Sequence, residues 1–133
     1  MENETCLQFD ALQTLARCSD AVTADCACSV HDLVGWTSLP VSFPEAQLGV
    51  VGTLIRDNYT EAAFDEYHPQ GTTFWSAEAP IAPRHFPANR CTVSTCKICQ
   101  RAYLRYVEGG GYFVDPRIRR LSANVLVDAP LPE

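Results

Sequence analysis

The sequence lacks any apolar run long enough to cross a bilayer, which takes about 20 consecutive apolar residues. Its opening residues, 1–5, carry two glutamates, whereas a secretory leader begins with basic residues and continues with an apolar stretch. These two absences predict a protein that is neither exported nor inserted in a membrane. We therefore expect a cytoplasmic protein, in a compartment where thiols stay reduced.

Motifs typical of enzymes are also missing. The chain has no phosphate-binding loop, no nucleophile elbow and no paired-carboxylate motif. Asp65, Glu66 and His68 are capable of acid–base chemistry, and Arg84 of clamping an anion, but no motif of a known reaction accompanies them. An enzyme, whether thiol-dependent or hydrolytic, is therefore the least favoured class of function.

Positive charge is scarce in the first part of the chain. Residues 1–83 hold 12 carboxylates and two arginines, a balance of −10, whereas residues 84–120 have a balance of +6. The favoured interpretation is that the two parts pack against each other and neutralise their charges. The alternative is that the basic segment binds a nucleic acid, although the acidic part would repel that polyanion over distances up to the Debye length.

Cysteine, by contrast, is abundant, with seven residues in a chain of 133. An odd number without a leader favours metal binding or redox chemistry over a disulfide framework. Cys91, Cys96 and Cys99 have the spacing C-x4-C-x2-C. Two thiolates separated by two residues lie on one tight turn, from which both can bind a zinc ion at about 2.3 Å. Lys97 within that turn favours the thiolate form.

The fourth ligand must come from upstream, because no cysteine follows Cys99. His68 lies beside two carboxylates that can orient its ring, so it ranks slightly ahead of His85, which has arginines nearby. A cysteine of the Cys26 and Cys28 pair is the remaining choice. The sequence thus predicts a structural zinc site, and its predicted ligands are Cys91, Cys96, Cys99 and His68.

Three other uses of these thiols stay open. A plant-type iron–sulfur cluster expects a further cysteine downstream, and a thioredoxin-like redox pair expects a helix after it. Buried cysteines that bind nothing are a third alternative. A separate N-terminal set is interpreted as core or loop residues rather than as a second metal site; its members are Cys18, Cys26, Cys28 and His31.

For the fold we expect one small α+β domain over residues 1–133, because a chain with 47% apolar residues can bury a core. An apolar stripe predicts a helix over residues 5–18, with Thr5 as its cap. Residues 21–31 are expected to form a loop or a short helical turn. β-Branched residues predict a strand over 49–55. The prolines and aromatic residues of 56–90 predict an ordered loop around the core.

The clearest predicted element is a β-hairpin over residues 102–115, where the glycine triplet 109–111 separates two aromatic and β-branched runs. This hairpin and the cysteine knuckle form a predicted module over residues 91–121, part of an antiparallel sheet. Beyond Pro116 we expect a helical turn containing Ile118 and Leu121, and then a strand over 125–127.

Basic and aromatic residues interleave on this hairpin, as they do where single-stranded nucleic acid stacks. The candidate residues for that alternative are Arg101, Tyr103, Arg105, Arg117 and Arg119. The favoured interpretation is a solvated face in which Tyr103 packs under the arginine stems.

Three stretches carry a resemblance: residues 64–69, residues 79–84, and the hairpin residues 104–106 with 117–119. They are similar to a group of small uncharacterised bacterial proteins, a resemblance that spans residues 36–128 and implies no activity. The Cys96–Cys99 turn resembles zinc-ribbon modules, without the second cysteine pair that a ribbon has downstream. We therefore expect a zinc-stabilised, non-enzymatic bacterial protein that binds or regulates a protein partner. One variant is an acidic protein that neutralises a basic toxin.

Overall fold

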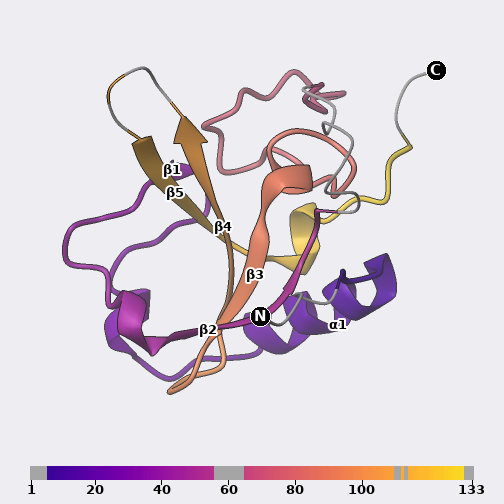
Figure 1. The fold of residues 1–133 in the computed structure, drawn as a ribbon. Coiled ribbons are helices and arrows are strands. Elements are labelled where there is room, and N and C mark those ends of the chain that lie inside the picture. The colour runs from indigo at the N-terminus through magenta and orange to yellow at the C-terminus, as the bar shows by residue number, and fades with distance from the viewer. Residues whose placement is uncertain (1–5, 56–64, 110–111, 113, 131–133) are drawn as a thin grey trace.

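A five-stranded antiparallel sheet forms the centre of the molecule, which the computed structural model describes over residues 6–55, 65–109, 112 and 114–130. The strand order is β1-β5-β4-β3-β2, and Figure 1 shows the helix α1 beside the sheet. The strands are β1 (Thr37–Ser38), β2 (Leu48–Thr53), β3 (Thr92–Cys96), β4 (Ala102–Gly109) and β5 (Val114–Arg120). The predicted α+β class is confirmed.

Helix α1 spans Phe9–Asp20, so the predicted helix is present but begins later than residue 5. Cys6 and Leu7 pair with the end of β2 instead: Cys6 forms a bridge with Thr53, and the Leu7 amide donates a hydrogen bond to the Thr53 carbonyl at 2.9 Å. The proposed cap Thr5 lies outside the described residues. Four short 3₁₀ helices complete the described elements: η1 (Ala27–Ser29), η2 (Glu45–Gln47), η3 (Ala88–Arg90) and η4 (Ala123–Val125).

Side chains that alternate along the central strands build a separate hydrophobic cluster on each face of the sheet. The cluster on the helix side includes Leu12, Ala16, Trp36, Cys91, Val93, Leu104 and Leu121. The cluster on the opposite face contains Cys28, Leu33, Phe43, Cys96, Tyr103 and Ile118. Because β3 and β4 contribute to both clusters, they are the strands that fix which side chains meet on each face.

The predicted hairpin is confirmed, since β4 and β5 pair from Gly109 with Val114 to Tyr103 with Arg120. The predicted helical turn after Pro116 is wrong, because β5 continues to Arg120 and Ile118 is fully buried within it. The predicted strand over 125–127 is wrong as well: Val125 ends η4, and Leu126 forms a single bridge with Ile81.

The loop predicted over 56–90 is irregular in its described part, residues 65–90, apart from η3. Phe74 connects it to the core, with ring centroids 6.2 Å from Trp36 and 6.3 Å from Phe86. The aromatic residues therefore fix this loop against the sheet, as the sequence predicts. Among the described residues, no helix has the length and apolar character needed to cross a bilayer.

Candidate metal centre

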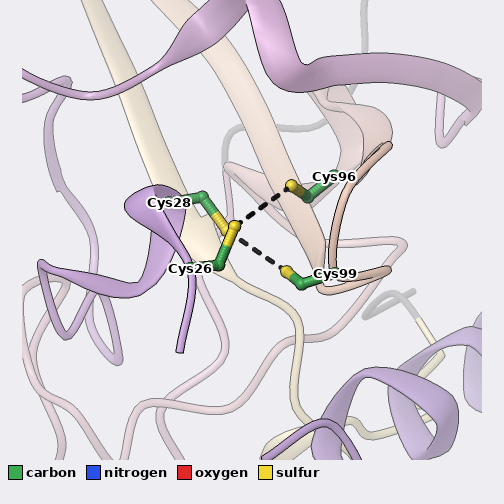
Figure 2. Close-up of side chains that lie close together, drawn as sticks. All are labelled: Cys26, Cys28, Cys96 and Cys99. Atoms are coloured by element: carbon green, nitrogen blue, oxygen red, sulfur yellow. Dashed lines mark hydrogen bonds between the residues drawn. The ribbon is translucent and has the colours of Figure 1, made fainter. Parts of the chain in front are cut away.

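The turn between β3 and β4 holds one pair of thiols. Cys96 is the last residue of β3, and its amide donates a hydrogen bond to the Arg101 carbonyl at 2.8 Å. The Gln100 amide donates to the Cys96 carbonyl at 2.8 Å, and Gln100 has a left-handed φ of 75°. These bonds close the turn, so that the sulfurs of Cys96 and Cys99 face the same way (Figure 2).

A second pair of thiols lies at the start of η1. Cys26 is extended, with φ −149° and ψ 155°, and the helix continues through Cys28. Ser29 stabilises this corner, because its hydroxyl donates to the Cys26 carbonyl at 2.9 Å and accepts from the Cys26 amide at 3.1 Å. Figure 2 shows both sulfurs of this pair directed toward Cys96 and Cys99.

The four sulfurs are spaced as the ligands of one tetrahedral ion would be. The Sγ atoms of Cys26 and Cys96 are 3.8 Å apart, those of Cys28 and Cys99 are 3.4 Å apart, and all four lie within 4.8 Å of one another. Four thiolates bound to a single ion at about 2.3 Å would be about 3.8 Å apart. Cys26, Cys28, Cys96 and Cys99, hereafter the four-cysteine site, are therefore close enough to hold a metal ion.

Two polar side chains contact the four-cysteine site. The Gln47 Oε1 atom accepts hydrogen bonds from Cys26 Sγ at 3.5 Å and Cys96 Sγ at 3.4 Å. The Tyr103 hydroxyl donates to Cys28 Sγ at 3.2 Å. A thiolate can only accept, so loss of the thiol protons would favour the Gln47 amide turned to present its NH2 group. Such contacts orient metal ligands and tune their basicity.

Protonation differs between the two members of the Cys28 and Cys99 pair. Burial raises the pKa of Cys28 well above the ordinary thiol value. Burial acts in the same direction on Cys99, but hydrogen bonds from the Arg101 backbone and from Cys28 outweigh it and lower the pKa of Cys99 to about 7. Cys99 is thus the easier thiolate to form, and a metal ion would have to displace the proton held by Cys28.

Arg101 connects the two halves of the site. Its guanidinium donates from Nη1 to the Ala24 carbonyl at 2.9 Å and from Nη2 to the Val22 carbonyl at 3.5 Å. The same side chain helps to lower the pKa of Cys99. The arginine therefore links the segment before η1 to the β3–β4 turn, and it brings positive charge to a site that would be anionic with four thiolates.

The structure separates the predicted ligands. It places Cys96 and Cys99 in the site, but Cys91 is fully buried in the cluster on the helix side, where its Sγ donates to the Pro87 carbonyl at 3.2 Å. Cys91 and Cys96 are five residues apart, and an odd spacing along extended chain directs side chains to opposite faces. The prediction of Cys91 as a ligand is corrected for this reason.

The two candidate histidines also lie outside the four-cysteine site. His68 Nε2 is 2.7 Å from Glu66 Oε1, the carboxylate contact that the sequence predicts, but its Nδ1 is engaged by Thr72 Oγ1 at 2.7 Å. His85 is buried and packs against the Tyr67 ring, with centroids 5.0 Å apart. The described residues therefore assign neither histidine to the four-cysteine site.

Cys26 and Cys28 take the places given to Cys91 and His68. The sequence offers them as an alternative source of one ligand, whereas the structure brings both to the site. The other members of their N-terminal set stay apart, because Cys18 is exposed and His31 Nε2 lies 3.0 Å from Ser42 Oγ. The alternation of Val93 and Cys96 along β3 is the signal that could have excluded Cys91.

The residues of the nucleic-acid alternative are largely buried or paired. Tyr103 is 1% exposed and Arg119 is 1% exposed, so neither presents a surface to a base. Arg105 Nη2 lies 2.6 Å from Glu45 Oε1, and Arg117 Nε lies 3.0 Å from Asp115 Oδ2. Arg101 makes the carbonyl contacts described above. Burial of Tyr103 removes the aromatic stacking on which this alternative depends.

No family model, curated protein or solved structure matches this chain.

Proposed function

We propose that the four-cysteine site binds one structural zinc ion, and that the protein is a non-enzymatic interaction or regulatory protein whose fold this ion stabilises. The observation that carries the proposal is the convergence of four Sγ atoms within 4.8 Å of one another. Soft thiolates in tetrahedral array select zinc or iron. An iron–sulfur cluster would place several irons and sulfides between the thiolates, and spacings of 3.4 and 3.8 Å suit a single ion.

The coordination argues for a structural role. Catalytic zinc keeps one position open for water or substrate, whereas four cysteines fill the tetrahedron. Cys28 and Cys96 are fully buried, so the ion would be shielded from solvent on their side. A partner would therefore meet the protein surface and not the metal. The acidic balance of residues 1–83 suits a partner with a basic face.

Native mass spectrometry with elemental analysis tests the proposal on protein purified without a metal column. We expect one zinc per chain, retained in Cys91→Ala and His68→Ala and lost in Cys28→Ser and Cys96→Ser. Cys18→Ser is the matched control, because Cys18 is exposed and outside the site. Metal-free protein, or a chain whose mass is four hydrogens lower because two disulfides have formed, would contradict the proposal.

Alkylation separates the structural site from a reactive thiol. Zinc-bound thiolates should react slowly with iodoacetamide until a chelator is added, and the four ligands should then be labelled together. Rapid labelling of Cys99 alone in the zinc-loaded protein would instead support a thiol enzyme.

A further inference from the structure

A second polar site lies on the helix side of the sheet, around the buried side chain of Arg119. This residue is 1% exposed, and the hydrogen bonds found for its guanidinium among the described residues all go to backbone oxygens. Nε donates to the Val34 carbonyl at 2.9 Å, and Nη2 donates to the carbonyls of Ala77 and Ala79 at 3.2 and 2.6 Å. No contact to Nη1 is found in the described part of the chain.

Arg119 differs in this respect from other arginines of the protein. Arg84, Arg105 and Arg117 each lie within 4.0 Å of a carboxylate. Among the described residues, no carboxylate is that close to Arg119. Burial without a counter-charge lowers the pKa of Arg119 to about 10. An unpaired buried cation is costly, so an anion that reached it would stabilise the fold.

A cavity gives such an anion a place. Arg119 lines it together with His85, which is 3% exposed and whose Nδ1 is buried without a hydrogen-bond partner. The aromatic side chains of Trp36, Phe74 and Phe86 form apolar walls of the same cavity. With its proton on Nδ1, a neutral His85 would be a second donor beside the Arg119 guanidinium, and a carboxylate has two oxygens to accept from such a pair.

The size of the cavity restricts the ligand. Its volume of about 20 Å³ compares with the roughly 10 to 15 Å³ that one water molecule needs. This space takes one or two atoms of the size of a water oxygen, so only the end of a ligand would enter it. Beyond its carboxylate, the ligand would therefore be short, or it would extend out of the cavity along the aromatic rings. Glu66 and His68, which are more exposed than Arg119, also line this cavity.

We infer that this cavity, lined by Arg119 and His85, is a binding site for a carboxylate group. The group would accept a hydrogen bond from Arg119 Nη1 and another from His85 Nδ1, and would neutralise the buried guanidinium. It belongs either to a small free carboxylate or to the end of a larger ligand such as a peptide C-terminus. The site is independent of the four-cysteine site, which lies on the opposite face of the sheet.

Nuclear magnetic resonance titration of the full chain tests the inference. Sodium acetate should shift the Arg119 Nε–H and His85 ring signals with saturation, while sodium chloride at the same ionic strength should not. An acetylated dipeptide with a free C-terminus and the same dipeptide with a C-terminal amide form the second arm. Tighter binding of the acid dipeptide than of acetate would identify a larger ligand, and the reverse would identify a small one; either outcome supports a carboxylate site.

Variants locate the binding. We expect His85→Gln and Arg119→Lys to bind acetate at least about tenfold more weakly, the loss that a charged or buried hydrogen bond predicts. Arg105→Lys is the control, because Arg105 pairs with Glu45 away from the cavity, and should bind as the wild type does. If Arg119→Lys fails to fold, acetate binding by His85→Gln alone tests the inference. Absence of saturable shifts, equal shifts with chloride, or unchanged binding in His85→Gln would overturn the inference.

Discussion

Gln100 follows the second cysteine of the β3–β4 turn and has a φ of 75°. Side chains with a Cβ are disfavoured in this left-handed region by roughly 1 to 2 kcal/mol, whereas glycine enters it freely. The turn needs this conformation because the Gln100 amide donates back to the Cys96 carbonyl. One residue therefore carries a conformational cost that allows both thiols of the turn to face the site.

Replacing Gln100 with glycine should remove the energetic cost of its left-handed backbone conformation. We expect Gln100→Gly to raise the free energy of unfolding by about 0.5 to 1 kcal/mol, since relief of the left-handed penalty exceeds the added entropy of the unfolded chain. Gln100→Val, with a branched Cβ, should lower it. Urea denaturation of zinc-loaded protein measures both changes. A glycine variant less stable than the wild type would show that the Gln100 side chain has a stabilising role of its own.

At the scale of elements, close contact between segments fixes how the aromatic loop meets the strands. Gly35 precedes β1, and a Cβ built on it would lie 2.7 Å from the Trp75 carbonyl oxygen and 3.2 Å from that of Ser76. Both neighbours are backbone atoms, so neither can move without displacing the loop. Absence of a side chain at this position is therefore what lets the 74–76 segment approach β1.

Adding one methyl group there tests this contact. We expect Gly35→Ala to lower the free energy of unfolding by about 1 to 3 kcal/mol, the usual cost of overpacking. Gly109→Ala is the matched control, because a Cβ at Gly109 would have no heavy atom within 4 Å. Thermal unfolding of both variants gives the comparison. Equal midpoints would mean that the loop can shift at little cost.

The elements that the sequence predicts well are those whose signals are local. The hairpin follows from a glycine triplet between two β-branched runs, and the Cys96–Cys99 half of the site follows from its own spacing. The wrong prediction of a helical turn at Ile118 has a local cause too. Arg117 and Arg119 alternate with the buried Ile118 in the two-residue period of a strand, but Pro116 was interpreted as the end of the strand. Pro116 fits β5 because it pairs opposite Val107 and accepts from the Leu39 amide.

At the scale of the whole molecule, the four-cysteine site joins segments that are distant in the chain. Cys26 and Cys96 are separated by 70 positions, and Cys28 and Cys99 by 71. No periodicity or spacing reports a contact over that distance, so the sequence identified one half of the site and assigned the other to nearer residues. By analogy with a disulfide, closing a loop of this length in the unfolded chain contributes about 4 kcal/mol.

Removal of the metal should therefore act first on the two segments that it connects. We expect a chelator to accelerate amide hydrogen exchange at least tenfold over Cys26–Val30 and Lys97–Gln100. Helix α1, whose Leu12 and Ala16 pack in the other cluster, should change less. Mass spectrometry of exchanged peptides measures this pattern. Exchange that is unaltered by the chelator would contradict a stabilising metal.

The strand order also has a consequence for synthesis on the ribosome. β1 and β2 are made first, yet they occupy opposite edges of the sheet, and the strands they pair with in the sheet, β5 and β3 respectively, are both made later. At about 5 to 20 residues per second, the 70 positions between Cys26 and Cys96 take roughly 4 to 14 s to emerge. During that interval Cys26 and Cys28 have no other cysteines of the site to bind a metal with. The nascent chain therefore needs its second half for two purposes, to pair β1 and β2 and to complete the set of metal ligands.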